Sequence, residues 1–87
     1  MPYIKQTTRK ILNRNLTEVV EKAHLWSSGD LNYIITKIVL AWIRKSDLSY
    51  VDIATVTGVL KNVSDEFTRR VVVPYEEAKR VVNGDVY

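Results

Sequence analysis

The chain has 87 residues, of which 46% are hydrophobic and two are Trp, and its net charge is +3. A domain of this size buries only about 60 to 65% of the surface that its unfolded chain exposes, so its own core is small for this apolar content. Cysteine is absent, which excludes disulfide bonds and thiolate metal sites as sources of stability. We therefore expect an oligomer, or a complex with a partner, to cover the remaining apolar surface.

The sequence predicts neither a signal peptide nor a membrane span. Its first ten residues are polar and include Lys5, Arg9 and Lys10, with no apolar run behind them. The longest apolar run, residues 38–43, is about six residues long, against the roughly twenty that a bilayer requires. A cytoplasmic protein without membrane contact is expected.

Basic residues gather in the first half of the chain. Residues 1–45 contain eight Lys or Arg and three acidic residues, a net charge of +5, whereas residues 46–87 contain five and seven, a net charge of −2. This excess suits an anionic partner, although moderate basicity is also common on solvated surfaces. A DNA- or RNA-binding interpretation would use four side chains on phosphates: Lys5, Arg9, Lys10 and Arg14. Against it stand the modest charge and the lack of a recognition motif.

Residues 1–8 show no helical periodicity, and Pro2 favours extended geometry at Met1, so an extended arm is predicted there. A first helix follows, because apolar residues then recur at steps of three and four up to Ala23. It is expected to end around Trp26.

A second helix is predicted from about Gly29 to Arg44. Ser27 or Ser28 suits its N-cap, and Asp30 places a carboxylate in its first turn. Apolar residues cover almost the whole circumference, which predicts a central position for this helix. They are Leu31, Ile34, Ile35, Ile38, Val39, Leu40, Ala41, Trp42 and Ile43.

The third helix has the clearest pattern. Ser49 and Asp52 resemble a capping box at its start, and heptad spacing follows in Ile53, Val56, Leu60, Val63, Phe67, Arg70 and Pro74. Arg70 occupies a position that the pattern would give to an aliphatic residue. Pro74 either bends this helix or separates it from a last short helix over residues 75–82, and both alternatives stay open.

The last helix is predicted to stop at Gly84, and Glu76 is placed to pair with Lys79 and Arg80. The expected fold is therefore all-α: one domain over residues 1–87, of three to four helices, with a long third helix bent near Pro74. Residues 1–8 form its arm and residues 84–87 its tail, and the domain is expected to be oligomeric.

No catalytic, metal or cofactor site is predicted. His24 is the only histidine, and the glycines at positions 29, 58 and 84 are too isolated to form a phosphate-binding loop. Asp65, Glu66, Glu76 and Glu77 have basic partners at helical ion-pair spacing, which indicates surface ion pairs instead of general acid or base catalysis. We therefore expect that the protein is not an enzyme.

A non-catalytic ligand site is the alternative that the residue types favour. Guanidinium groups suit phosphate and aromatic rings suit a base, which gives the candidate set Asn32, Tyr33, Arg69, Arg70, Tyr75, Lys79 and Tyr87. Structural roles compete with this interpretation: Tyr33 at the rim of a core, Arg69 paired with Asp65 or Glu66, and Arg70 at a subunit contact.

The chain resembles a family of short bacteriophage and prophage proteins of unknown function that end in an NGDVY-type tail. The resemblance lies in GDLNYII at residues 29–35, GVL at 58–60, FTRRVVVPYE at 67–76 and NGDVY at 83–87. It implies expression in the host cytoplasm and no cofactor. By analogy of origin it suggests a sponge that sequesters a cyclic nucleotide signal. The alternatives are a DNA- or RNA-binding protein and a helical adaptor that inhibits a host protein through Trp26 and Trp42.

Overall fold

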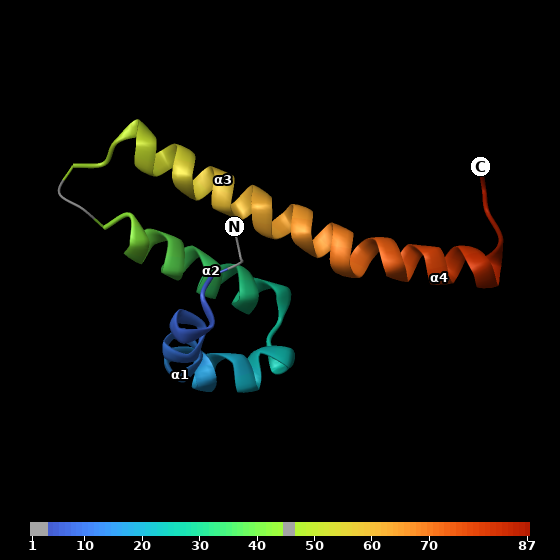
Figure 1. Ribbon diagram of the computed structural model, residues 1–87, viewed down its shortest axis with the longest axis horizontal. Helices are drawn as coiled ribbons and strands as arrows, with labels where there is room; N and C mark the ends of the chain where they lie inside the picture. Colours follow the sequence, from blue (N-terminus) through green and yellow to red (C-terminus); the bar gives the residue numbers. More distant parts are fainter. Residues whose placement is uncertain (1–3, 45–46) are drawn as a thin grey trace. The chain divides into compact units, whose positions relative to one another are not determined.

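The structure, a computed structural model, describes residues 4–44 and 47–87. Its elements run in the order α1 (Gln6–Lys22), the 3-10 turn η1 (Ala23–Leu25), α2 (Ser28–Trp42), α3 (Tyr50–Phe67), the π-helical turn η2 (Thr68–Val72) and α4 (Val73–Asn83) (Figure 1). The described ranges contain no strand, so the all-α prediction is confirmed.

Helix α1 begins earlier than predicted. Its N-cap, Lys5, is extended with φ −60° and ψ 145°, and the backbone N–H of Arg9 donates the first helical bond to the Lys5 carbonyl at 3.0 Å. Gln6, Thr7 and Thr8 are therefore helical, so the extended arm is shorter than predicted, and residues 1–3 lie outside the described residues. These polar residues carry no apolar periodicity, which is why the pattern gave no sign of the first turn.

Helix α2 begins where two side chains close a capping box. The Ser27 hydroxyl oxygen accepts from the Asp30 N–H at 3.1 Å, and the Ser27 N–H donates to the Asp30 carboxylate at 3.0 Å. Two N–H groups at the helix start thereby gain partners. Of the two predicted N-cap candidates, Ser27 is the one used.

A related arrangement opens α3, as predicted. The N–H and hydroxyl of Ser49 donate to the Asp52 carboxylate at 3.3 and 3.1 Å, and the Asp52 N–H donates to the Ser49 hydroxyl at 3.2 Å. Within residues 4–44 and 47–87, Asp52 is the one buried residue, at 9% exposure. The helix then carries the heptad positions Ile53, Val56, Leu60, Val63 and Phe67, which we call the apolar seam.

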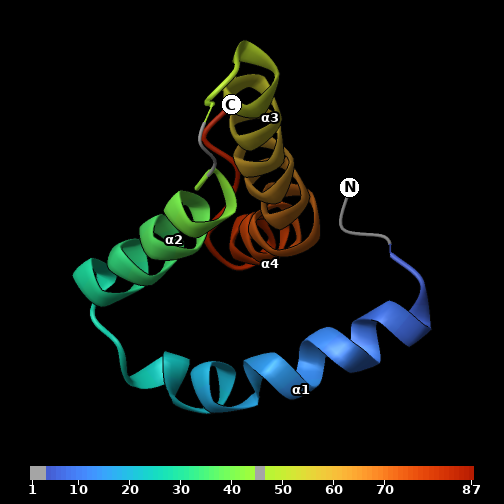
Figure 2. The same ribbon diagram turned by 90° about the vertical axis from the view of Figure 1, so that its left-hand side faces the viewer.

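The helix does not end at Pro74. The backbone is right-handed helical at Phe67, Val72 and Val73, and the ribbon passes from α3 through η2 into α4 without a break (Figures 1 and 2). Pro74 lacks the N–H that an α-helix needs at this point. The five-residue π turn before it changes the hydrogen-bond register so that the helical path continues. The alternative of two separate helices is therefore wrong, and the predicted last helix is the end of a longer one.

Helix α4 stops at the predicted glycine. Gly84 has φ 86°, a left-handed conformation that side chains other than glycine disfavour, and its N–H donates to the Arg80 carbonyl at 2.8 Å. Residues 84–87 follow as the expected non-helical tail.

Contacts within the chain divide it into two units, Met1–Ile53 and Ala54–Tyr87. The first contains α1, η1, α2 and the start of α3, and the second contains the rest of α3, η2, α4 and the tail. A single domain over residues 1–87 stays a prediction. In the described part of the chain no hydrophobic side chain is buried, and Ile38 and Trp42 of α2 remain 56% and 50% exposed. The apolar stripe predicted for α2 is present.

Candidate ligand-binding site

Arg69 and Arg70 lie side by side in η2 and converge on one carboxylate. The Arg69 Nη2 atom lies 2.8 Å from Oε2 of Glu66, and Arg70 Nε lies 3.9 Å from the same oxygen. The same Nη2 atom also donates to Glu66 Oε1 at 3.0 Å, so one nitrogen of Arg69 contacts both carboxylate oxygens. Both arginine side chains are more than half exposed. The predicted structural role of Arg69 as a partner of Glu66 is thus present, and Arg70 lies near the same carboxylate.

Tyr75 and Lys79 form the second group of predicted site residues. They are four residues apart on α4, and the Lys79 ammonium nitrogen lies 5.6 Å from the centroid of the Tyr75 ring. An ammonium group at this distance interacts with the electron-rich face of the ring. The aromatic face and the positive charge that a nucleotide would use are therefore adjacent.

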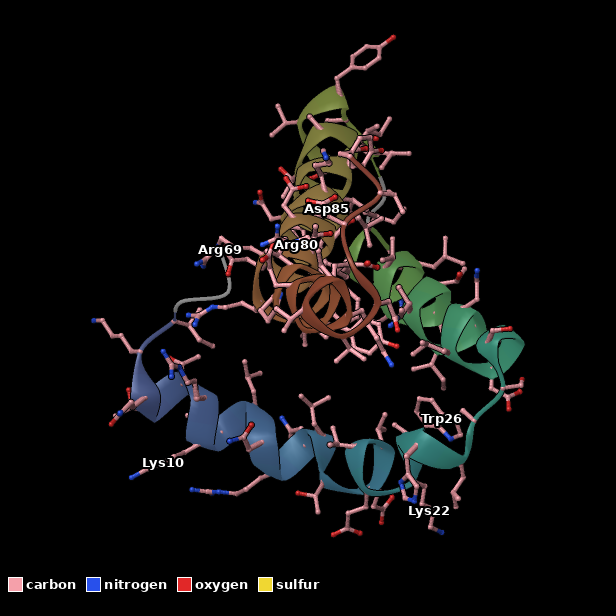
Figure 3. All side chains as sticks on the ribbon, turned by 90° about the vertical axis from the view of Figure 1, so that its right-hand side faces the viewer. Lys10, Lys22, Trp26, Arg69, Arg80 and Asp85 are labelled. Atoms are coloured by element: carbon pink, nitrogen blue, oxygen red, sulfur yellow. The ribbon has the colours of Figure 1, made fainter. Side chains whose placement is uncertain are left out.

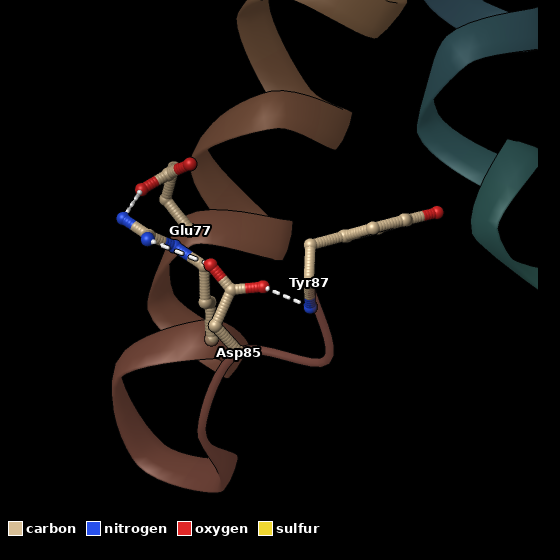
Figure 4. Close-up of polar contacts among 4 residues, drawn as sticks. Glu77, Asp85 and Tyr87 are labelled. Atoms are coloured by element: carbon tan, nitrogen blue, oxygen red, sulfur yellow. Dashed lines mark hydrogen bonds and ion pairs between the residues drawn. The ribbon is translucent and has the colours of Figure 1, made fainter.

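Arg80 is a functional candidate that the sequence-based set lacks. Its guanidinium donates to Glu77 at 2.8 Å and to Asp85 at 3.3 Å, and the Asp85 carboxylate accepts the backbone N–H of Tyr87 at 2.9 Å (Figure 4). The hydrogen bonds that Arg80 donates to Glu77 and Asp85, together with the negative charge of Glu77, raise the pKa of Arg80 above its ordinary value. Arg80 thereby ties the tail to α4.

The pairing differs in detail from the prediction. Glu76 was expected to pair with Lys79 and Arg80, but Arg80 pairs with Glu77, and Lys79 lies over Tyr75. Both carboxylates are one helical turn before Arg80. Spacing alone therefore does not decide which of the two carboxylates pairs with Arg80. The contact of Arg80 with Asp85 involves a residue beyond the helix end, which helical spacing does not consider.

An open hollow of about 320 Å³ lies where the tail folds back on α4. Lys79, Arg80 and Tyr87 line it, but so do the acidic residues Glu76, Glu77 and Asp85. Three carboxylates against two cations give this hollow no positive excess. The hollow therefore does not by itself favour a phosphate.

Asn32 and Tyr33 belong to the first unit, whereas the other five predicted site residues belong to the second. The Asn32 carbonyl accepts the Thr36 hydroxyl at 2.8 Å, and its side-chain oxygen lies 3.3 Å from the same hydroxyl. The Lys37 ammonium lies 6.0 Å from the Tyr33 ring centroid, an arrangement similar to that of Lys79 and Tyr75. A role for Asn32 and Tyr33 in the same site stays a prediction.

The four cations of the nucleic-acid interpretation lie at the start of α1. Lys5 is the N-cap, and the first turn contains no acidic residue. Arg9 donates to the Ile4 carbonyl at 2.9 Å, and the Lys10 side chain extends away from the α1 ribbon in Figure 3. With Arg14 these residues place several exposed cations on one short helical segment.

No group of three or more His, Cys, Asp or Glu side chains that could hold a metal ion occurs within residues 4–44 and 47–87. None of the helices in the described ranges combines the length and the apolar character that crossing a membrane requires.

The fold defines a small all-α protein built of amphipathic helices. The chain belongs to the family described as a domain of unknown function (DUF6899), whose model matches residues 1–86. Neither the curated proteins nor the solved structures contain a match to the chain.

Proposed function

We propose that the chain is a non-catalytic accessory protein of bacteriophage type that binds a small anionic nucleotide where copies of the chain meet. The observation that carries this proposal is the convergence of Arg69 and Arg70 on Glu66 in η2. The carboxylate holds two exposed guanidinium groups in position, and a phosphate could take its place.

A phosphate has the geometry that this pair requires. Guanidinium groups can bind phosphate oxygens through parallel hydrogen bonds, and one nitrogen of Arg69, Nη2, already donates to both oxygens of Glu66. A nucleotide with two phosphate groups offers more acceptor oxygens than a single carboxylate. Displacement of Glu66 is therefore favourable when both guanidinium groups bind the ligand.

The remaining residues suit the other parts of a nucleotide. Tyr75 lies five residues beyond Arg70, about 7.5 Å along a helix axis, and Lys79 lies over its ring. Stacking on an aromatic ring tolerates any base, and Tyr87 adds a second ring in the same unit. Asn32 and Tyr33 would complete the site from another part of the assembly.

The apolar content of the helices supports assembly. In the residues that the structure describes, no hydrophobic side chain is buried, and the apolar seam of α3 includes Val63 and Phe67 at 60% and 57% exposure. Large exposed apolar surfaces of this kind indicate protein–protein contact. Arg70 follows the end of the seam by three residues, inside the π turn, so the guanidinium pair would lie next to such a contact.

Binding without turnover gives such a protein a biological use. A sponge lowers the concentration of a signal by holding it, and it needs affinity and abundance but no catalytic group. The resemblance to phage and prophage proteins makes a cyclic nucleotide of a host defence pathway the ligand class we propose.

Calorimetry on the purified chain tests the site with a panel of cyclic dinucleotides, cyclic trinucleotides and ADP. We expect one cyclic nucleotide to bind, Arg70→Ala to weaken its binding at least tenfold, and Lys61→Ala, which removes another exposed cation of the same unit, to have no effect. Chromatography of the released ligand should return it unchanged. Equal affinity for the wild type and Arg70→Ala would rule out the site, and a chemically altered ligand would rule out a non-catalytic role.

DNA or RNA binding is the second candidate, and the group of cations at the start of α1 favours it. Four phosphate contacts would give a slope of about −3.6 in a plot of log affinity against log salt for duplex DNA. Charge reversal by Lys10→Glu and Arg14→Glu should weaken such binding, with Arg70→Ala as the control that leaves it unchanged. If none of the three substitutions changed nucleic-acid binding, these cations would not form the interface. The adaptor role of Trp26 and Trp42 would then be the remaining candidate.

A further inference from the structure

The π turn η2 changes the rotation of α4 relative to α3. In an α-helix each residue advances the backbone by about 100°, and each N–H donates to the carbonyl four residues earlier. In η2 the N–H of Val73 donates instead to the carbonyl of Thr68, five residues earlier. The turn therefore contains one additional residue, and the side chains of α4 are rotated by about 100° from the positions that an uninterrupted α-helix would give them.

Glu66 and Tyr75 show what this rotation does to the candidate site. Glu66 lies in α3 with both guanidinium groups near its carboxylate, so it marks the position of the guanidinium pair. Tyr75 follows nine residues later in α4, in the same unit of the chain. Nine residues of regular α-helix would place the two side chains about 180° apart, on opposite faces. With the additional residue of η2 they are about 80° apart, on one half of the helix surface.

We infer that Pro74 is a positioning residue of the nucleotide site: it causes the π turn, and the π turn brings Tyr75 to the side of the helix that carries the guanidinium pair. Pro74 touches no ligand atom and acts through the position of Tyr75. This inference rests on the proposed function. It adds to that function the residue that joins the phosphate-binding part and the base-binding part into one site.

The chemistry of proline explains why the turn lies at this place. In a regular α-helix the residue at position 74 donates its N–H to the carbonyl of Arg70, and a proline ring there clashes with that carbonyl. Pro74 has no N–H, so a wider turn directly before it gives up no hydrogen bond that this residue could make. Turns of the π type are rare, and they frequently occur at functional sites.

The rotation matters because one nucleotide has to bind the guanidinium pair and stack on the ring at the same time. Groups on opposite faces are separated by the helix itself, which is about 10 to 12 Å thick with its side chains. On one half of the surface no backbone lies between them. Tyr75 also has the Lys79 ammonium 5.6 Å from its ring centroid, so the rotation moves an aromatic ring and a positive charge together.

Pro74→Ala tests the inference, because alanine allows a regular α-helix at this place. The Val73 N–H should then donate to the carbonyl of Arg69 instead of Thr68, which NMR couplings across the hydrogen bond detect without any ligand. Calorimetry compares two probes on the full chain. One is the cyclic nucleotide that the wild type binds, and the other is inorganic diphosphate, which has phosphate groups but no base.

We expect Pro74→Ala to weaken nucleotide binding about five- to tenfold, the loss that corresponds to one stacking ring. Diphosphate affinity should stay within about twofold of the wild type. Glu66 lies three and four residues before Arg69 and Arg70, a spacing at which side chains also meet in a regular α-helix. Weaker nucleotide binding by a helix that is at least as stable would separate positioning from a merely structural role.

A second variant tests the position of the ring directly. In a regular α-helix position 74 lies eight residues after Glu66, about 80° around the axis, which is where the π turn places Tyr75. Pro74→Tyr combined with Tyr75→Ala therefore returns the ring to its place without the proline. This double variant should recover the nucleotide affinity of the wild type to within about twofold, whereas Tyr75→Ala alone should bind as weakly as Pro74→Ala.

Four results would overturn the inference. They are an unchanged Val73 hydrogen bond in Pro74→Ala, wild-type nucleotide affinity in that variant, equal losses for nucleotide and diphosphate, and no recovery in the double variant. Failure of the proposed function gives a different result, because the wild type then binds no nucleotide or binds it as tightly as Arg70→Ala does. A wild type whose nucleotide binding depends on Arg70 but not on Pro74 would refute the positioning role alone.

Discussion

The backbone N–H of Val73 donates to the carbonyl oxygen of Thr68, five residues earlier and one residue further than in an α-helix. This bond lies directly before Pro74, the residue that cannot donate from its own backbone nitrogen. The π turn that the bond closes contains Arg69 and Arg70. The register change that accommodates the proline is therefore also the element that presents the guanidinium pair.

Replacing Pro74 by alanine should stabilise the helix. The substitution restores a backbone donor and removes the clash of the proline ring inside a continuous helix, an interior penalty of about 3 kcal/mol that the π turn partly relieves. We expect the free energy of unfolding to rise by about 1 to 3 kcal/mol in urea denaturation at fixed protein concentration. Val82→Ala, at a 79% exposed position of the same helix, is the control and should change little. Unchanged stability in Pro74→Ala would mean that the π turn has another cause.

Removing the Ser27 hydroxyl should weaken the start of α2. The hydroxyl oxygen accepts the N–H of Asp30, and its loss leaves that donor to water. N-cap substitutions of this type cost about 1 kcal/mol. Ser28→Ala, one residue inside the helix, should stay within about 0.5 kcal/mol of the wild type in the same urea experiment. Equal losses for the two variants would contradict the assignment of Ser27 as the cap.

Helix boundaries were predictable where a single local interaction decides them. Ser27 with Asp30, Ser49 with Asp52, and Gly84 each act within three or four residues, and each was found at or next to the predicted position. The start of α1 was missed because Gln6, Thr7 and Thr8 have no apolar spacing to detect. Polar first turns require no burial and therefore leave no periodic signal.

The candidate site was less predictable, because residue spacing allows more than one ion pair for the same side chain. Arg80 has acidic residues both three and four positions before it. In the structure it pairs with Glu77, and it also pairs with Asp85, which lies beyond the helix end. Sequence also indicates that Pro74 disrupts the helix without saying whether the backbone breaks or changes register. That outcome depends on the balance of hydrogen bonds over residues 68–73.

The Lys61 side chain should titrate at a higher pH than an isolated lysine. Its hydrogen bond to Asp65 at 2.9 Å, and the charge of that carboxylate, raise the pKa of Lys61 above its ordinary value of 10.5. Because the folded pKa exceeds the unfolded one, the pair contributes its full stabilisation below pH 10.5 and loses it as pH rises through the folded pKa. An NMR titration of the Lys61 side chain should show a raised midpoint that returns to the ordinary value in Asp65→Asn. The same midpoint in both proteins would contradict the interaction.

A charge placed in the apolar seam should separate the assembly. Val63 belongs to the apolar seam, so in an assembly that forms through this seam Val63→Asp would bury a carboxylate in the contact. We expect dissociation of the assembly to become at least about 100-fold more favourable, equivalent to about 2.7 kcal/mol. Asn62→Asp introduces the same charge one residue earlier, on a helical position beside the seam, and should leave the assembly intact. Sedimentation equilibrium over a range of protein concentrations measures both variants. Equal association of Val63→Asp and the wild type would show that the seam is not the contact surface.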